Sequence, residues 1–126
     1  MCSSDLLYVP VEEPKDAERT SEYAKAAAQR LAEEHPGLVV AKMERRLRKG
    51  RIFVDWSQNN PAKTTVAPYS LRAARRPSVS TPITWDELDS CENVADLVFS
   101  PADVLARLDE HGDLLEPLLN DRQPLP

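Results

Sequence analysis

A carboxylate at the end of a short apolar strand is the sequence feature that most constrains how this chain can fold. The segment RIFVDWSQNNPAKTTVAPYSLR contains the apolar run IFV, and Asp55 follows that run directly. Burying an unpaired charge costs on the order of several kcal/mol, so a carboxylate there needs a cation, hydrogen-bond donors or a metal ion. The segment therefore predicts a strand that ends at a polar site.

Strand-like and helix-like patterns alternate along the whole chain. Apolar, partly β-branched runs predict strands over residues 6–11, 38–41, 51–56 and 63–69, and the turn SQNNPA joins the last two. Helical patterns cover residues 16–34, the basic turn 43–49, a short segment from Thr84 and a segment from Ser100 to Gly112. Residues 70–82 lack periodicity and predict a surface loop. The alternation indicates an α/β (α+β) layer fold with a mixed sheet and flanking helices.

Local signals define the predicted helix ends and faces. Asp16 is the expected N-cap of the first helix, and His35-Pro36-Gly37 ends it. The expected inner face of that helix comprises Tyr23, Ala24, Ala27, Ala28 and Leu31. Ser100-Pro101 starts the later helix, whose expected inward residues are Val104, Leu105 and Leu108.

Length and composition bound the class of protein. The chain has 126 residues with 41% hydrophobic residues, which suits one small domain with a core. No apolar run approaches the roughly 18 residues of a membrane span, and the first residues do not form a signal peptide. Cys2 and Cys91 lack metal-ligand spacing and indicate reduced thiols in a cytosolic protein.

The net charge of −5 hides an uneven distribution. Ten Lys or Arg residues lie between Lys42 and Arg76, opposed only by Glu44 and Asp55, so this segment carries +8 and the rest of the chain −13. Such a band suits a polyanion such as nucleic acid or a triphosphate, but it is equally typical of a solvated surface.

The residues around Asp55 allow two chemical interpretations. Hydrogen-bond donors or cations follow it at Gln58, Lys63 and Arg72. A carboxylate among such groups fits a structural ion pair or a metal site that also holds a phosphate-bearing ligand. Trp56 and Tyr69 fit either base stacking or core packing. Spacing alone leaves these alternatives open.

A family resemblance favours one of them. From about Leu7 to Leu119 the chain resembles the C-terminal part of the polymerase domain of bacterial DNA ligase D, of the archaeo-eukaryotic primase superfamily. The residues that carry this resemblance are YVPVEEP, the Ala-rich segment after it, RKGRIFVDWSQN, KTTVAPYSLR and the pattern of Thr81, Pro82, Thr84 and Trp85. The resemblance implies a partial primase-polymerase core whose N-terminal half is missing.

The same resemblance assigns roles to particular residues. Asp55 matches the third of three carboxylates that hold a divalent metal pair, Mn or Mg, and is the expected catalytic and metal-binding residue. Gln58, Arg72 and Lys63 match nucleotide-binding positions, with Arg72 suited to triphosphate oxygens. The expected DNA-binding residues are Arg48, Arg45 and Arg46.

The chain also departs from the family pattern. No D-x-D pair is present to supply the first two metal ligands, and Leu6 stands where the family has a histidine before its Y-V-P strand. Ala74 replaces a second arginine of the family. We therefore expect residues 1–5 to be a non-family leader, residues 6–120 to be the polymerase-domain portion, and residues 121–126 to be a tail or linker.

The resemblance implies a fragment of a domain that transfers nucleotides to DNA ends in bacterial non-homologous end joining. Because one carboxylate cannot assemble a two-metal site, we expect the fragment to be inactive alone and to hold no metal tightly. The alternatives are a non-catalytic nucleic-acid-binding module and a chain that folds only with a partner supplying the missing half. The resemblance implies DNA ends, nucleoside triphosphates, a ligase domain and Ku as partners, no membrane, and a bacterial cytoplasmic, nucleoid-associated location.

Overall fold

The computed structural model describes residues 5–12, 17–73 and 75–125, which form two compact units. The Asp55 unit comprises the described residues from Glu12 to Thr65 together with the chain end from Pro124. The Arg107 unit comprises the described residues up to Val11 and those from Val66 to Gln123. Helices and small sheets occur together, so the expected mixed α/β fold is confirmed.

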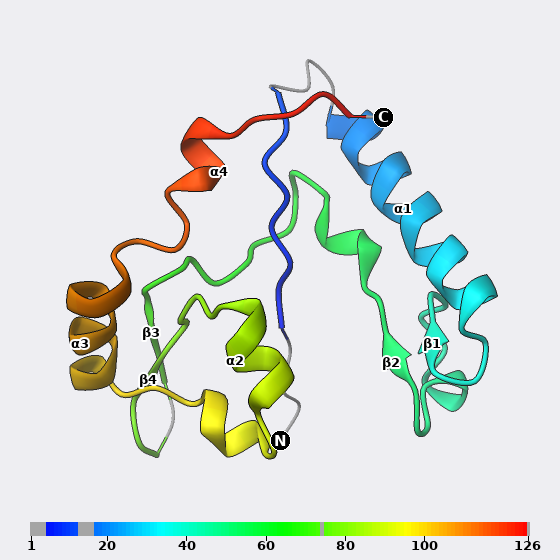
Figure 1. Cartoon of the computed structure of the whole chain (residues 1–126). Coiled ribbons are helices and arrows are strands. Elements are labelled where there is room, and N and C mark those ends of the chain that lie inside the picture. The colour runs from blue at the N-terminus through cyan, green and yellow to red at the C-terminus, as the bar shows by residue number, and fades with distance from the viewer. Residues whose placement is uncertain (1–4, 13–16, 74, 126) are drawn as a thin grey trace. The chain divides into compact units, whose positions relative to one another are not determined.

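The Asp55 unit is built from one long helix and a pair of short parallel strands (Figure 1). Its elements in chain order are α1 (Ala17–Glu34), β1 (Val39–Val40), the 3-10 helix η1 (Arg45–Leu47), β2 (Ile52–Phe53) and the 3-10 helix η2 (Trp56–Gln58). Val39 pairs with Ile52 and Val40 with Phe53.

Small side chains form the packed face of α1. Ala28 is fully buried and Ala24 and Ala27 are half-buried, whereas Tyr23 and Leu31 are 43% and 42% exposed. The inner face is therefore narrower than the sequence predicts, because alanines let the helix backbone approach β1 and η2 closely. The helix ends at Glu34, directly before the predicted stop at His35-Pro36-Gly37, and its predicted cap Asp16 lies outside the described residues.

The connection between β1 and β2 sets the position of Asp55. Parallel strands need a crossover that returns the chain to the end of the sheet where the first strand began, and residues 41–51 form this crossover. Gly50, with φ +70°, reverses the chain just before β2, in a backbone region that residues with a Cβ rarely adopt. Backbone bonds from Ile52 to Leu38 (2.7 Å) and from Val54 to Val40 (3.0 Å) continue the pairing on either side. Asp55 therefore follows the carboxyl end of β2.

The Arg107 unit combines a short antiparallel strand pair with helices. Its elements in chain order are β3 (Leu71–Arg72), β4 (Ser78–Val79), α2 (Trp85–Ser90), η3 (Val94–Leu97), α3 (Pro101–His111) and α4 (Pro117–Asn120). β3 pairs with β4, and Val79 also forms a bridge to Phe99, so α3 begins beside the strand pair (Figure 1).

Capping boxes start both longer helices of this unit, at the starts that the sequence predicts from Thr84 and Ser100. Thr84 caps α2 with Glu87, and Ser100 caps α3 with Asp103. The prediction that Leu105 faces inward is wrong, because its side chain is 66% exposed.

Three further segment predictions are wrong. Residues 6–11 form no strand. Val11 makes an isolated β-bridge to Gln123, and residues 6–10 pair with no strand among the described residues. Residues 63–69 are likewise irregular: Tyr69 N donates to the Ser80 carbonyl beside β4 at 2.7 Å, but the Tyr69 backbone leaves the extended region with φ +62°. The predicted loop 70–82 instead contains β3 and β4, which stabilise each other by pairing.

The hydrophobic core is small. The buried apolar side chains of the described residues are Ala28, Val39, Val40 and Val104. Larger side chains such as Leu7 and Trp85 are 73% and 68% exposed. Of the helices in the described part of the chain, none has the length and apolar character needed to cross a membrane.

The neighbours Val104 and Leu105 provide a matched test of this core. Val104→Ala removes buried methyl groups and should lower the free energy of unfolding by about 1–3 kcal/mol. Leu105→Ala removes more atoms from an exposed position and should change it by less than about 0.5 kcal/mol. Urea unfolding of both variants measures these two changes in the free energy of unfolding. Equal decreases would contradict the burial of Val104 and the exposure of Leu105.

Candidate active site

Asp55 occupies the N-cap of η2, where donors surround its carboxylate. Its Oδ1 accepts hydrogen bonds from the backbone N of Ser57 (3.1 Å) and from Ser57 Oγ (2.5 Å). Its Oδ2 accepts a bond from Gln58 Nε2 (3.1 Å). A carboxylate at this position satisfies helix N–H groups that have no partner within the helix.

Lys63 completes this cluster through Ser57. Lys63 Nζ donates to Ser57 Oγ at 2.5 Å. Partial burial alone would raise the pKa of Asp55, but the hydrogen bonds from Ser57 and Gln58 and the charge of Lys63 outweigh it and hold this pKa below its ordinary value. Neighbouring donors and a lysine thus stabilise the strand-end carboxylate.

Trp56 fixes η2 against the rest of the unit. Its indole Nε1 donates to the Ala41 carbonyl at 3.3 Å, and the Lys25 ammonium lies 5.2 Å from the ring centroid. The side chain is half-buried where η2 packs on α1. Packing is therefore the role that these contacts support for this aromatic residue.

The described residues do not by themselves provide the ligand set of a divalent metal. Among them, no three His, Cys, Asp or Glu side chains gather closely enough to hold an ion. Both oxygens of Asp55 accept hydrogen bonds, and the Lys63 ammonium, bound to Ser57, contributes a positive charge to this network. Mg²⁺ or Mn²⁺ would need further carboxylate ligands.

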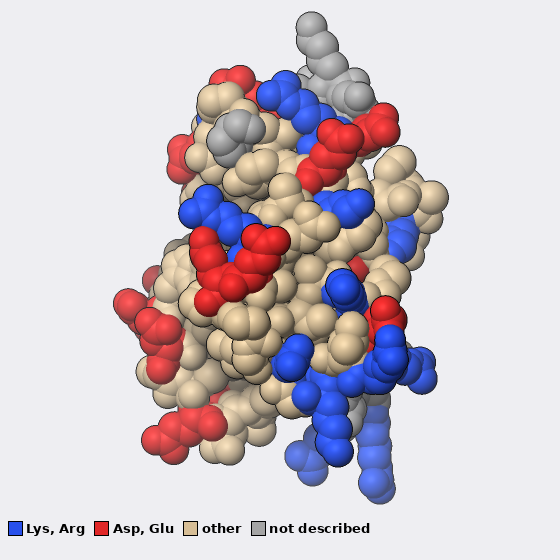
Figure 2. Space-filling view, turned by 90° about the vertical axis from the view of Figure 1, so that its right-hand side faces the viewer, with Lys and Arg blue, Asp and Glu red and all other residues tan. Residues whose placement is uncertain are grey.

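A cluster of positive side chains surrounds η1, and we call it the basic cluster. Its members are Lys42, Arg45, Arg46, Arg48, Lys49 and Arg51. Figure 2, which faces this side of the molecule, shows Lys and Arg side chains gathered at the lower right. The close spacing of these charges creates a local positive potential in a chain of net negative charge.

The arginines of this cluster differ in how firmly they are held. Arg48 is half-buried, with its guanidinium carbon 3.9 Å from the Phe53 ring centroid and a hydrogen bond to the Met43 carbonyl. Arg46 pairs with Glu44 at 2.8 Å, but its side chain is 81% exposed, so this pair contributes little. Arg45 is exposed. Arg48 is therefore partly structural, whereas Arg45 and Arg46 face solvent.

The structure brings three of the predicted site residues together. Asp55, Gln58 and Lys63 share one hydrogen-bonded network in the Asp55 unit. Arg72 belongs to the Arg107 unit, where it is exposed in β3 opposite Ser78. Sequence reasoning missed Ser57, although a hydroxyl two residues after a strand-end Asp is a known local capping pattern.

A second polar cluster links the helices of the Arg107 unit. Arg107 forms two hydrogen bonds to the carboxylate of Glu87, one of them at 2.8 Å, and donates to the Pro82 carbonyl at 3.2 Å. Its guanidinium carbon lies 4.5 Å from the Phe99 ring centroid. The hydrogen bonds from Arg107, with those from Thr84, outweigh partial burial and lower the pKa of Glu87 to about 2.

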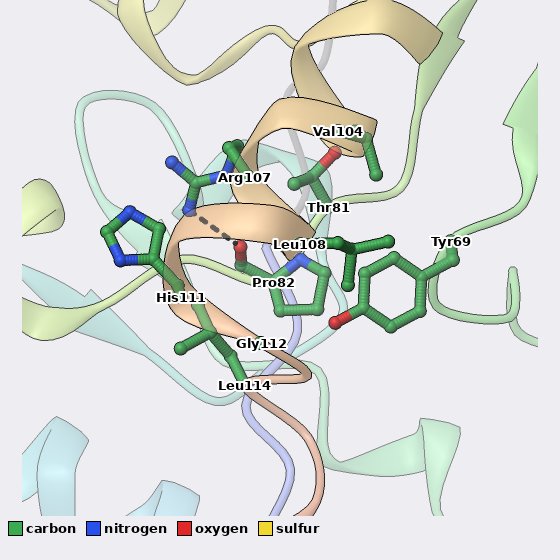
Figure 3. A pocket seen from close by; sticks show the side chains of 9 residues that line it. All are labelled: Tyr69, Thr81, Pro82, Val104, Arg107, Leu108, His111, Gly112 and Leu114. Carbon is green, nitrogen blue, oxygen red and sulfur yellow. Dashed lines mark hydrogen bonds between the residues drawn. The ribbon is translucent and has the colours of Figure 1, made fainter.

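Arg107 also lines a small pocket between α3 and the segment before α2 (Figure 3). His111 and Tyr69 lie on opposite sides of this pocket in the view. The Tyr69 hydroxyl donates to Asp113 Oδ1 at 2.7 Å, and burial together with this bond raises the pKa of Tyr69 to about 12. The bond connects residues 44 positions apart in the sequence. It holds Tyr69, whose backbone lies in the left-handed region with φ +62°.

Comparison with known proteins identifies the family. The family model "LigD, primase-polymerase domain" matches residues 6–115. The chain is 52% identical over 112 residues to the multifunctional non-homologous end joining protein LigD of Mycolicibacterium smegmatis, and 47% identical over 112 residues to that of Mycobacterium tuberculosis. Each alignment covers 89% of this chain and 14% of the relative.

A solved structure agrees with these matches. The chain is similar to the polymerase domain of Mycobacterium tuberculosis ligase D in complex with DNA, with a TM-score of 0.81 and 45% sequence identity. The match covers 90% of this chain and 38% of the solved one. This chain belongs to the LigD primase-polymerase domain family. It spans about a seventh of the length of its curated relatives.

The pairing of Glu87 with Arg107 predicts a pH dependence of stability. The pKa of Glu87 is lowered from 4.5 to about 2, so the pair stabilises the fold above about pH 4.5 and loses this effect as the pH falls towards 2. Glu87→Gln should therefore be less stable than the wild type at pH 6, and the difference should shrink between pH 4.5 and 2. Urea unfolding at several pH values checks this; a constant difference would contradict the assignment.

Proposed function

We propose that this chain forms part of a polymerase domain that transfers nucleotides to DNA ends in bacterial non-homologous end joining. The observation that carries the proposal is its match, over 90% of its length, to a ligase D polymerase domain solved with DNA. The order of its motifs corresponds to the C-terminal portion of such a domain. DNA ends and nucleoside triphosphates are the proposed ligands, the ligase domain and Ku the proposed partners, and the bacterial nucleoid the proposed location.

Asp55 is the proposed catalytic carboxylate. A divalent metal ion, Mn²⁺ or Mg²⁺, would supply charge neutralisation for nucleotidyl transfer in the complete site. Among the described residues, Asp55 is not joined by two further potential ligands, so the ion needs ligands from elsewhere. We therefore propose that this chain holds no metal tightly and extends no primer by itself.

The groups around Asp55 suit the incoming nucleotide. Gln58 has two amide donors, of which one contacts Asp55, and Lys63 presents an ammonium group at the same network. Arg72 is exposed and has the planar donor geometry that matches phosphate oxygens. We assign Gln58 and Lys63 to the triphosphate, and Arg72, which belongs to the Arg107 unit, from the family resemblance alone.

The basic cluster suits the DNA backbone. Phosphate contacts from Lys and Arg supply sequence-independent affinity and release counterions. Arg45 and Arg46 are exposed within η1, and Arg48, which follows η1, lies with its guanidinium on the Phe53 ring. We assign Arg45, Arg46 and Arg48 to DNA phosphates.

A non-catalytic nucleic-acid-binding module is the second candidate function. Its support is the Asp55 carboxylate, whose two oxygens both accept hydrogen bonds from its own neighbours. In that case the basic cluster would bind DNA and Asp55 would serve only as the cap of η2. The two candidates agree on DNA binding and differ on catalysis, so each needs its own experiment.

Charge reversal tests the DNA surface. Arg45→Glu with Arg46→Glu should weaken binding to a short duplex roughly tenfold at low salt and make the salt dependence shallower by about one unit per lost phosphate contact. Fluorescence anisotropy across a salt series measures both. The control is Arg19→Glu with Arg30→Glu on α1, which changes the net charge equally at exposed positions. Equal weakening by both pairs would show a non-specific charge effect and contradict the assignment.

Complementation tests catalysis. Primer extension on a gapped, 5′-phosphorylated duplex should be absent with this chain alone. Extension should appear when the portion of the Mycobacterium tuberculosis polymerase domain that this chain does not match is added in trans. In the restored mixture Asp55→Ala should abolish extension, and Arg72→Ala should chiefly raise the nucleotide concentration needed. Extension that survives Asp55→Ala would refute the catalytic assignment and favour the binding module.

A further inference from the structure

Ser57 joins the two charged groups of the Asp55 network. Its hydroxyl lies 2.5 Å from Asp55 Oδ1 on one side and 2.5 Å from Lys63 Nζ on the other. Its backbone N also donates to Asp55 at 3.1 Å, so the residue is fixed to the carboxylate at two atoms. The family resemblance gave Ser57 no role.

Donor and acceptor chemistry fixes the direction of both hydrogen bonds. An ammonium group can only donate, so the Ser57 oxygen accepts from Lys63. An ionised carboxylate can only accept, so the single hydroxyl proton points to Asp55. Each bond polarises the hydroxyl in the sense that strengthens the other. Changing the hydroxyl should therefore affect both charged partners.

The direction of the Lys63 side chain depends on this contact. Lys63 lies in irregular chain between η2 and β3, where a turn at Asn60 fixes its backbone: Lys63 N donates to the Asn60 carbonyl at 3.0 Å. No direct ion pair joins Lys63 to Asp55 in the described part of the chain. A lysine side chain that lacks a fixed partner samples many rotamers. The hydrogen bond to the Ser57 hydroxyl therefore restricts Lys63 to one of them.

The bound ammonium keeps donors for a ligand. A lysine has three N–H donors, and Ser57 uses one of them. Lys63 is exposed, so the others face solvent beside the carboxylate. An anion with several oxygens that reaches this edge would meet a cation already oriented, which lowers the entropy cost of binding it.

We propose that Ser57 is a positioning residue for triphosphate binding, holding the Lys63 ammonium beside Asp55 so that its free donors meet phosphate oxygens. This rests on the proposed function, in which Lys63 contacts the incoming nucleotide. Ser57 touches no phosphate itself; it acts through Lys63.

The test follows the Lys63 ammonium directly by NMR of the full chain labelled with ¹³C and ¹⁵N in lysine. The Lys63 signal is the one that Lys63→Arg removes, and titration with inorganic tripolyphosphate gives an affinity at that side chain, separate from the basic cluster. Ser57→Ala should move the free-state Lys63 signal towards that of a solvated lysine. It should also weaken tripolyphosphate binding at Lys63 by about threefold to tenfold.

Conservative and control variants separate positioning from general destabilisation. Ser57→Thr keeps the hydroxyl and should retain the wild-type signal and affinity, whereas Ser57→Cys keeps the size but bonds weakly and should behave like alanine. Ser90→Ala removes an exposed hydroxyl in the Arg107 unit and should change neither the Lys63 signal nor the tripolyphosphate affinity at Lys63. Thermal melts identify any variant that does not fold, and the cysteine variant then replaces the alanine one.

Two outcomes would overturn the proposal in different ways. If Ser57→Ala and Ser57→Cys leave the affinity at Lys63 unchanged, Ser57 does not position Lys63, and the proposed function is unaffected. If tripolyphosphate leaves the wild-type Lys63 signal unmoved, Lys63 is no triphosphate ligand. The nucleotide assignment of the proposed function then fails together with the role of Ser57.

Discussion

The parallel pairing of β1 with β2 is the constraint on which the Asp55 unit depends. Two residues pair on each strand, and backbone bonds from Ile52 and Val54 extend the pairing on both sides. Because the strands are parallel, the chain between them must cross over and return, and that crossover carries the basic cluster. The same pairing places Asp55 at the strand end. The positions of the carboxylate and of the basic cluster in the fold therefore both depend on the parallel arrangement of β1 and β2.

The Asp55 network illustrates how local hydrogen-bond donors can stabilise a strand-end carboxylate. Ser57, Gln58 and Lys63 supply local donors, and the pKa of the carboxyl lies below its ordinary value as a result. A metal ligand needs free lone pairs aimed at the ion, whereas a helix cap needs them aimed at N–H groups. Oδ1 accepts two hydrogen bonds and Oδ2 accepts one, so a ligand at Oδ1 would displace one of these bonds, whereas Oδ2 keeps one acceptor position.

The sequence predicted helices better than strands, for a physical reason. Helix ends at Thr84, Ser100 and Gly112 depend on side chains within a few residues, so local patterns reveal them. Strands depend on a partner elsewhere in the chain, which explains why residues 63–69 are irregular and why β3 and β4 were missed. Whether Val104 or Leu105 is buried depends on which side of α3 packs against the rest of the unit, and the local sequence does not specify that side.

The site was predictable in composition but not in connectivity. The family resemblance selected Asp55, Gln58 and Lys63, and the structure joins them in one network. The linking hydroxyl of Ser57, the pairing of Glu87 with Arg107 and the bond from Tyr69 to Asp113 were not foreseen. The last two connect residues 20 and 44 positions apart, a separation that no local pattern encodes.

Arg107 has a consequence for which sequences this fold can accept. One guanidinium contacts a carboxylate on α2, the Pro82 carbonyl before that helix and the face of Phe99 before α3. A lysine would keep the charge but could not span all three, since its ammonium lacks a planar fork and a stacking face. Substitution there would leave the Glu87 carboxylate and the Phe99 ring without this partner, so we expect positions 87, 99 and 107 to change together among relatives.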